Sequence, residues 1–208
     1  MQNMKILAFG DPHGDMLSLQ TVKQKAHEVD LVICLGDITW FGEDLEELLA
    51  FINTFPKKVL LLHGNHEPGE MMRSLSEQYE NIEYLHGQLS THNNFHFLAY
   101  GGDGFSRRDA EFEETMHKLA KEVKEMHKTV LLLHGPPYKT KLDQPYPEYH
   151  SGSESYREFI EEHQPLLVLA GHIHEGEKEL DNIGEAMLFN PGPDGEIIDL
   201  HVLRAQRK

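Results

Sequence analysis

Five short motifs along this 208-residue chain combine carboxylate, imidazole and glycine residues. The first is Gly-Asp-Pro-His-Gly-Asp at residues 10–15, in which a carboxylate and an imidazole stand two residues apart. The other four are Gly-Asp at 36–37, Gly-Asn-His-Glu at 64–67, His-Gly at 134–135 and Gly-His-Ile-His at 171–174. Such donors, with no thiolate among them, suit Mn, Fe, Ni, Co or Zn and disfavour a structural zinc site of the cysteine type.

Each motif taken alone also has a purely structural explanation. A Gly-Asp pair after a strand is more often a turn or a helix cap than a ligand. Asn-His and His-Gly pairs usually belong to loops, and Gly-His-Ile-His favours neither explanation. Because all five follow apolar segments, coincidence is a poor explanation for the set. The donors suffice for two metal ions, and such a pair can activate a bridging water and clamp the oxygens of a phosphoryl group.

The elements expected to position these motifs are buried strands. Apolar runs at residues 5–10, 31–35, 59–62, 130–133 and 166–170 directly precede the five motifs. Helical apolar periodicity is expected at 15–29, 43–55, 71–79, 109–128 and 153–163. The carboxyl ends of strands in an open sheet gather at one rim, where ligands bind, so the motifs should meet there.

The remaining segments predict further strands. Residues 82–85 and 95–100 are expected as strands joined by a polar turn at 91–94. Segments 186–190 and 196–203 flank Pro-Gly-Pro-Asp-Gly and predict a hairpin, followed by a frayed tail at 204–208. With no linker or repeat, we expect residues 1–208 to form a single α/β domain with more than one sheet in a layered core.

Composition excludes several classes of function. A formal net charge of −16 argues against a nucleic-acid surface and a polybasic membrane patch. It allows a phosphate substrate, because bound divalent cations can reverse the local field. Cys34 is the single cysteine, which excludes an internal disulfide, and its apolar surroundings predict an inert core thiol. No apolar run could span a membrane, so a cytoplasmic protein is expected, and the oligomeric state is left open.

The ordered set of motifs resembles the calcineurin-like metallophosphoesterases, in their small prokaryote-type branch, over residues 11–174. The resemblance implies a four-layer αββα sandwich, with two mixed β-sheets packed face to face and flanked by helices. It implies that two divalent transition-metal ions bind, with Mn expected first and Fe, Ni, Co or Zn as the others. By the same resemblance, one metal is held by Asp11, His13, Asp37 and His174, and the other by Asp37, Asn65, His134 and His172, with Asp37 bridging.

The resemblance also implies how the site works. Asp37, Asn65 and His66 are the expected catalytic residues, and Asn65 and His66 are expected to contact the substrate as well. His66 would stabilise the transition state or protonate the leaving oxygen, positioned beside the phosphate and not bound to metal. The expected reaction is hydrolysis of a small phosphodiester, with nucleotide-type esters as candidates, by in-line attack of a metal-bridging hydroxide.

Departures from the family pattern narrow the substrate. Protein serine/threonine phosphatases carry Asp-Arg-Gly after the second motif, whereas Ile-Thr-Trp-Phe-Gly follows Asp37 here, which argues against a phosphoprotein substrate. The acidic composition argues against the repair nucleases of this superfamily. The alternatives are a phosphomonoesterase of the same fold and a non-catalytic scaffold or sensor. Scaffolds tend to lose ligands, and this chain has the complete set.

Several residues outside the motifs have two possible roles. Residues 138–152 follow a predicted ligand and could overhang the site, with Lys141 or His150 contacting phosphate, or could form a plain surface loop. Trp40 and Phe41 could wall the pocket, although seating the next helix is the favoured interpretation. Glu67 is expected to act as a cap or as a hydrogen-bond acceptor for the ligand loops, and not as a base.

Overall fold

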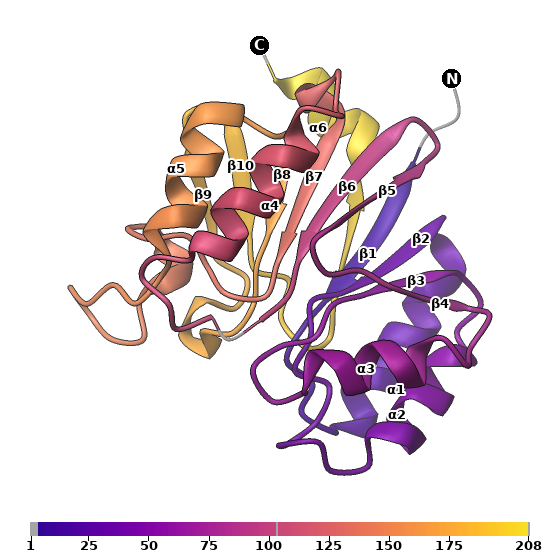
Figure 1. Ribbon diagram of the computed structural model, residues 1–208. Helices are drawn as coiled ribbons and strands as arrows, with labels where there is room; N and C mark the ends of the chain where they lie inside the picture. The colour runs from indigo at the N-terminus through magenta and orange to yellow at the C-terminus, as the bar shows by residue number, and fades with distance from the viewer. Residues whose placement is uncertain (1–3, 103, 208) are drawn as a thin grey trace.

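The computed structural model describes residues 4–102 and 104–207 as two β-sheets with helices on their outer faces (Figure 1). The strands are β1 Lys5–Phe9, β2 Leu31–Cys34, β3 Val59–Leu61, β4 Ile82–Tyr84, β5 Gln88–His92, β6 Phe95–Tyr100, β7 Thr129–Leu133, β8 Leu167–Leu169, β9 Leu180–Ile183, β10 Ala186–Phe189 and β11 Glu196–Asp199. The α-helices are α1 Met16–Lys25, α2 Leu45–Asn53, α3 Gly69–Ser76, α4 Ala110–Ala120, α5 Glu154–His163 and α6 Leu200–Gln206. Short 3₁₀ turns are η1 Ala26–Glu28, η2 Met126–Lys128, η3 Lys141–Asp143 and η4 His174–Gly176.

Both sheets are mixed. The first, which we call sheet A, has the order β11-β1-β2-β3-β4, and the second, sheet B, has the order β5-β6-β7-β8-β10-β9. In sheet A, β1 to β4 are parallel and β11 is antiparallel to β1. In sheet B, β5 and β9 are the antiparallel edge strands.

The central strands are apolar on both faces because both faces are covered. Ile6 and Ala8 of β1 belong to the core between the sheets, whereas Leu7 and Phe9 belong to the core under the helices of the first half of the chain. In Figure 1, α1, α2 and α3 cover the outer face of sheet A, and α4 and α5 cover that of sheet B. The predicted four-layer αββα arrangement is confirmed.

Side-chain caps mark where α1, α4, α5 and α6 begin. Asp15 accepts from the backbone N–H of Leu17 at the start of α1, and Asp109 accepts from that of Phe112 at the start of α4. Ser153 caps α5, since its side chain accepts from the backbone N–H of Tyr156. Among the helices of the described ranges, none is both long enough and apolar enough to cross a membrane.

The predicted pairing of residues 82–85 with 95–100 is wrong. Strand β4 lies in sheet A beside β3, whereas β6 lies in sheet B between β7 and β5, and β5 is a strand that the sequence did not predict. The turn is made by Asn93 and Asn94, which both have positive φ angles of 47° and 65°. Two such residues in succession give the tight hairpin turn whose twist matches that of the flanking strands.

The predicted long helix and C-terminal hairpin also need correction. Helix α4 ends at Ala120, although the apolar spacing continues through Val123, which is buried in the same core. Strands β10 and β11 belong to different sheets, so the segment between them crosses the molecule instead of making a hairpin. Strand β11 ends at Asp199, whose side chain caps α6. Helix α6 therefore stands where the last part of the predicted strand 196–203 and the start of the predicted frayed tail were expected.

The motifs follow strands β1, β2, β3, β7 and β8, whose carboxyl ends point to the same end of the molecule, away from the two termini (Figure 1). Backbone hydrogen bonds connect the loops there, including Gly102 N–H to His63 O and Gly171 N–H to His134 O. The loops of the two sheets therefore meet at one rim, as expected for strands that end together.

Candidate metal centre

Four of the predicted ligands have left-handed backbone conformations. Asp11, His13, Asp37 and His172 have φ angles of 57°, 43°, 49° and 70°. This conformation costs a residue with a side chain about 1–2 kcal/mol and is concentrated at functional sites. Hydrogen bonds between loops hold two of these turns, since the Asp11 N–H donates to Gly36 O at 3.1 Å and the His13 N–H donates to Asp37 O at 3.0 Å. The chain thus turns sharply at the ends of β1, β2 and β8.

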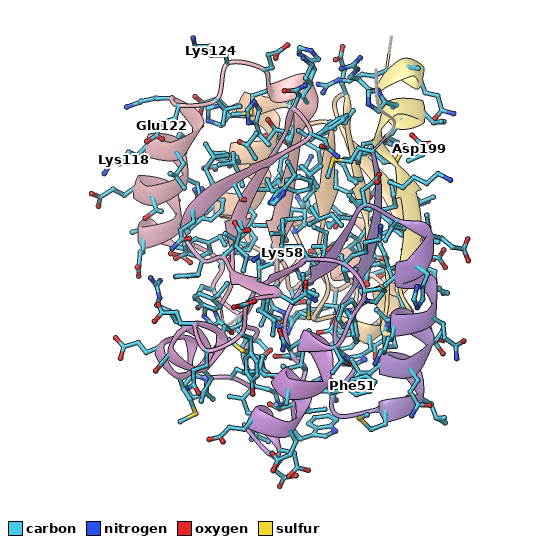
Figure 2. The ribbon with its side chains drawn as sticks, turned by 90° about the vertical axis from the view of Figure 1, so that its right-hand side faces the viewer. Phe51, Lys58, Lys118, Glu122, Lys124 and Asp199 are labelled. Atoms are coloured by element: carbon cyan, nitrogen blue, oxygen red, sulfur yellow. The ribbon has the colours of Figure 1, made fainter. Side chains whose placement is uncertain are left out.

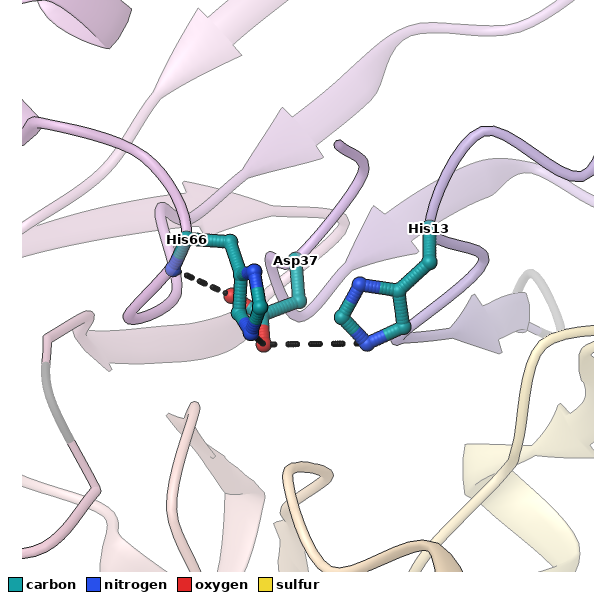
Figure 3. Close-up of side chains that lie close together, drawn as sticks. All are labelled: His13, Asp37 and His66. Atoms are coloured by element: carbon teal, nitrogen blue, oxygen red, sulfur yellow. Dashed lines mark hydrogen bonds and ion pairs between the residues drawn. The ribbon is translucent and has the colours of Figure 1, made fainter. Parts of the chain in front are cut away.

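Asp37 is the point at which the site converges. Its side chain is nearly inaccessible, and its Oδ2 atom lies 3.9 Å from His13 Nε2, 3.8 Å from His66 Nε2 and 3.5 Å from His134 Nε2. Figure 3 shows His13 and His66 directed at this carboxylate from different loops. Three imidazoles that follow β1, β3 and β7 therefore surround one buried carboxylate.

Backbone carbonyls fix which nitrogen of two imidazoles carries hydrogen. His13 Nδ1 lies 2.9 Å from Thr39 O, and His134 Nδ1 lies 2.9 Å from Leu35 O. A carbonyl only accepts, so each Nδ1 is the donor, and Nε2, the atom that faces Asp37, is the nitrogen that can bind a cation when the ring is neutral. His134 Nε2 also lies 3.0 Å from Asn65 Oδ1. The Nε2 atoms of His13 and His134 thus lie close to the oxygens of Asp37 and Asn65, and together these atoms form a set of ligands that fits a cation.

His66 has the opposite arrangement. The backbone N–H of Phe41 donates to His66 Nδ1 at 3.3 Å, so the neutral ring carries its hydrogen on Nε2. The backbone N–H of His66 donates to Asp37 Oδ1 at 2.9 Å, which holds the loop in place. An imidazole with hydrogen on Nε2 is suited to donating a proton from that atom and not to binding a metal through it.

The charges of the buried groups also fit a cation. Burial raises the pKa of Asp11 to about 6, and the nearby Asp37 carboxylate adds to this. Within the described ranges, Asp11 Oδ1 is buried and has no hydrogen-bond partner, whereas Oδ2 accepts from His172 N–H at 2.9 Å. Burial opposes a charged His134, yet its contact with Asp37 raises its pKa to about 9. The two adjacent buried carboxylates thus favour a positive charge on the imidazole of His134. A bound cation would supply that charge instead.

The structure brings all seven predicted metal ligands to this rim. Asp37 belongs to two compact groups of donor atoms, one with His134 and His172 and one with His13 and with His66, which is not a predicted ligand. Asn65 joins the first of these groups through His134, and Asp11 joins it through His172. His174 stacks on His13 with ring centroids 5.3 Å apart. Two clusters that share a carboxylate are consistent with a dinuclear metal centre.

Glu67 clamps two of the ligand loops together. Its buried carboxylate accepts hydrogen bonds from the backbone N–H groups of Asp37 at 3.0 Å, Thr39 at 2.8 Å and Gly64 at 3.1 Å, and from the Thr39 hydroxyl at 2.9 Å. Thr39 and the carbonyl of Leu35 were not expected to take part. Glu67 thus acts as the hydrogen-bond acceptor that the sequence predicted. The feature of the sequence that indicated this role is its position three residues after Gly64.

The segment of residues 138–152 is organised around a different carboxylate. Asp143 is buried and accepts from the N–H groups of Lys139, Thr140 and Gly152 and from His150 Nδ1, the last at 2.6 Å. Lys141 donates its backbone N–H to Asp181. Figure 1 shows the middle of this loop projecting on the α5 side, away from sheet A. The structure therefore gives His150 a structural partner, and contact of Lys141 or His150 with substrate stays a prediction.

Three exposed aromatic residues surround the site. Trp40 is 51% exposed and stacks on His13 with ring centroids 4.1 Å apart, and Phe41, 80% exposed, lies 4.3 Å from His66. Phe105, 67% exposed, packs edge-on against His172 at 4.5 Å. Trp40 and Phe41 therefore wall the site, against the interpretation that the sequence favoured. Their position directly after the Gly-Asp motif was the only signal for this role.

The sequence profile of the calcineurin-like phosphoesterases matches residues 4–176, which include every motif of the site. The chain belongs to this family. Membership makes it a metal-dependent phosphoester hydrolase by class, with a phosphate ester as the substrate, and its His and Asp clusters are the metal-site candidates.

Individual relatives agree with this placement of the phosphoesterase. An uncharacterised protein of Methanocaldococcus jannaschii, MJ1162, is 31% identical over 200 residues, which cover 91% of this chain and 88% of that protein. The crystal structure of TT1561 of Thermus thermophilus has a TM-score of 0.74 at 16% identity, covering 97% of this chain and 96% of the other. A structure described as a novel archaeal phosphodiesterase has a TM-score of 0.50 at 12% identity, covering 94% and 99%. At these identities the two structures show a shared fold alone.

Proposed function

We propose that this phosphoesterase hydrolyses small phosphodiesters with two divalent transition-metal ions, Mn first among the candidates. The observation that carries the proposal is the convergence of His13, His66 and His134 on Asp37, with hydrogen positions that differ between them. When bound, the two ions would activate a water and offset the charge of the phosphate. We assign one ion to Asp11, His13, Asp37 and His174, and the other to Asp37, Asn65, His134 and His172.

The remaining roles belong to the chain's own side chains. Asn65 directs Oδ1 at His134 Nε2, which leaves its amide nitrogen to donate to a phosphate oxygen. His66 Nε2 donates to the leaving oxygen, since its Nδ1 is held by the Phe41 N–H. Glu67 keeps the loops of Asp37 and Gly64 at a fixed separation, so that these groups are placed before the substrate arrives.

A diester is favoured over a monoester by the charges near the site. A monoester dianion would benefit from an arginine or lysine, and the segment Ile-Thr-Trp-Phe-Gly that follows Asp37 supplies neither, in contrast to the Asp-Arg-Gly of the protein phosphatases. A diester carries one negative charge and a second ester group. The exposed rings of Trp40, Phe41 and Phe105 offer that group an apolar surface.

The deciding experiment compares bis-p-nitrophenyl phosphate with p-nitrophenyl phosphate on chelator-stripped protein, adding back Mn, Ni, Co, Zn and Mg singly. We expect metal-restored turnover to be higher with the diester. Faster monoester turnover would indicate a phosphatase instead. Two bound ions per chain without turnover of either ester would favour a scaffold or sensor.

Two variants test the assigned roles. His66→Ala should keep its metal content and lose about a hundredfold or more in turnover, as expected for a lost proton donor. His127→Ala, at an exposed position away from the site, serves as the matched control. Asp37→Asn should lose metal, and full activity with both ions retained would disprove the bridging role.

A further inference from the structure

A hollow of about 620 Å³ opens beside the metal centre, between the N-terminal end of α1, helix α2 and the loop that joins β2 to α2. His13 and Trp40 line it, and these two rings are stacked on each other. His13 also contacts Asp37. A group seated in the hollow would therefore be next to a phosphate bound at the metal centre. The proposed function gives this hollow no role.

The wall of the hollow has a large apolar part. Met16 and Trp40 are 39% and 51% exposed, and Leu48 and Phe51 complete this side. Phe51, which lies on the helical layer beside sheet A, is labelled in Figure 2. The chain already places one cation over its ring, since Lys23 Nζ lies 5.0 Å from the Phe51 centroid. Aromatic faces of this kind attract ammonium groups.

The rest of the lining is acidic. Glu43, Asp44 and Glu47 all border the hollow and are exposed. Within residues 4–102 and 104–207, none of the three forms an ion pair with a lysine or arginine at 4 Å or less. Lys23 donates to Thr54 Oγ1 at 2.7 Å and is not among the residues that line the hollow. An ester group with a second phosphate or a carboxylate would be repelled, whereas a cationic one would be attracted.

We propose that this hollow binds the alcohol part of a phosphodiester whose alcohol bears an ammonium group, such as a choline or ethanolamine ester. The inference rests on the proposed function for the reaction itself, and it adds the class of alcohol that the diester carries. The ammonium would lie against Trp40 and near the carboxylates of Glu43 and Glu47. The net charge of −16 disfavours an anionic membrane surface, so a water-soluble diester is the expected source.

Binding can be measured without turnover, because Trp40 is the single tryptophan of the chain. Choline is titrated into chelator-stripped protein at constant ionic strength while tryptophan fluorescence is recorded. We expect a saturable change that 3,3-dimethylbutanol, the uncharged isostere of choline, does not produce. The double variant Glu43→Gln/Glu47→Gln should weaken choline binding about tenfold. Glu46→Gln, on the same helix but outside the hollow, should leave it unchanged.

Turnover supplies the second measurement. In the metal-loaded protein, kcat/KM for p-nitrophenyl phosphocholine should exceed that for p-nitrophenyl 3,3-dimethylbutyl phosphate by about tenfold. The Glu43→Gln/Glu47→Gln variant should reduce this ratio toward one, and Glu46→Gln should preserve it. Soluble glycerophosphocholine and vesicles of phosphatidylcholine are compared to distinguish the two sources of the headgroup. Hydrolysis of the vesicles without hydrolysis of glycerophosphocholine would overturn the soluble source.

The two proposals fail in different ways. Saturable choline binding with no hydrolysis of any ester would support the hollow as a cation site and refute the proposed function. Hydrolysis of both test diesters at equal rates, with no saturable fluorescence change, would overturn the cation site while the phosphodiesterase assignment stands.

Discussion

Glu67 gives the sharpest test of how the metal centre is held, because its carboxylate has four partners in two loops. The substitution Glu67→Gln keeps the size of the side chain and replaces one oxygen by an amide group. If the amide replaces Oε2, it faces the N–H groups of Asp37 and Gly64. If it replaces Oε1, it faces the N–H of Thr39 and a hydroxyl that can rotate to accept. The second orientation is the less costly one.

That orientation still loses one hydrogen bond to a charged group and leaves the Thr39 N–H buried without a partner. A charged hydrogen bond contributes about 1.5–3 kcal/mol, and an orphaned buried donor costs about 1–3 kcal/mol. These terms overlap, so we expect Glu67→Gln to lower the free energy of unfolding by about 2–4 kcal/mol. For a chain of this length, that corresponds to a fall in Tm of about 5–15 °C.

The same change should weaken metal binding. Groups that orient metal ligands typically contribute about 10- to 100-fold in affinity. Calorimetry in the presence of chelator measures stability, and titration with Mn²⁺ or Zn²⁺ measures affinity. Glu70→Gln is the matched control, since Glu70 is exposed in the first turn of α3. A Glu67→Gln protein with the Tm and metal affinity of that control would refute the clamp.

Three further tests follow, the first at the tight turn between β5 and β6. Asn94→Val should lower the free energy of unfolding, measured with urea, by about 1–2 kcal/mol, because valine disfavours the φ of 65° there. Asn94→Gly should not lower it. Cys34 is buried and its pKa is raised by burial, so Ellman's reagent should label it only after denaturation, and rapid labelling of native protein would contradict this. Burial lowers the pKa of His86 in the folded protein, so the unfolded state takes up the proton first as the pH falls through about 6.5, and stability should drop on the acid side. His86→Gln should flatten the fall of Tm between pH 7.5 and 5 relative to an exposed-histidine control, His127→Gln, and superimposable curves would exclude this contribution.

The sequence predicted the buried strands and the positions of the motifs well, because both depend on local information. A strand covered on both faces has a continuous apolar run, and the motif after it stands at a fixed distance along the chain. Which strands pair is not local information. Residues 82–85 and 95–100 are close in sequence and were expected to pair, but Ile82–Tyr84 follows the parallel order of sheet A and β6 pairs with Gln88–His92.

The C-terminal correction has the same origin. The Pro-Gly-Pro-Asp-Gly segment has the composition of a hairpin turn, and composition alone cannot distinguish a reversal within a sheet from a crossing between sheets. Strand β11 has a sheet edge available beside β1, with Lys5 opposite Asp199. Pairing there joins the last strand of the chain to the first, a contact between segments that are far apart in sequence.

In the candidate site, the sequence identified side chains but not the backbone groups that decide how they act. Nothing in a list of histidines distinguishes one whose Nδ1 donates to a carbonyl from one whose Nδ1 accepts from an N–H. Likewise, the contacts of Trp40 with His13 depend on the path of the loop after Asp37. That path follows from a left-handed turn at Asp37, which residue type does not predict.

The segment of residues 35–41 supplies the backbone group that contacts Nδ1 in each of three histidines, and so determines whether that nitrogen donates or accepts. Leu35 and Thr39 supply the carbonyls that accept from Nδ1 of two of the rings, and Phe41 supplies the N–H that donates to Nδ1 of the third. Between them, Asp37 supplies the carboxylate on which all three rings converge. One turn after β2 therefore sets the position of the shared carboxylate and the hydrogen pattern around it. A displacement of this turn would disturb both predicted metal positions and the proton donor together. The hydrogen bonds from this turn to the buried Glu67 should therefore affect metal binding and catalysis more than their individual energies indicate.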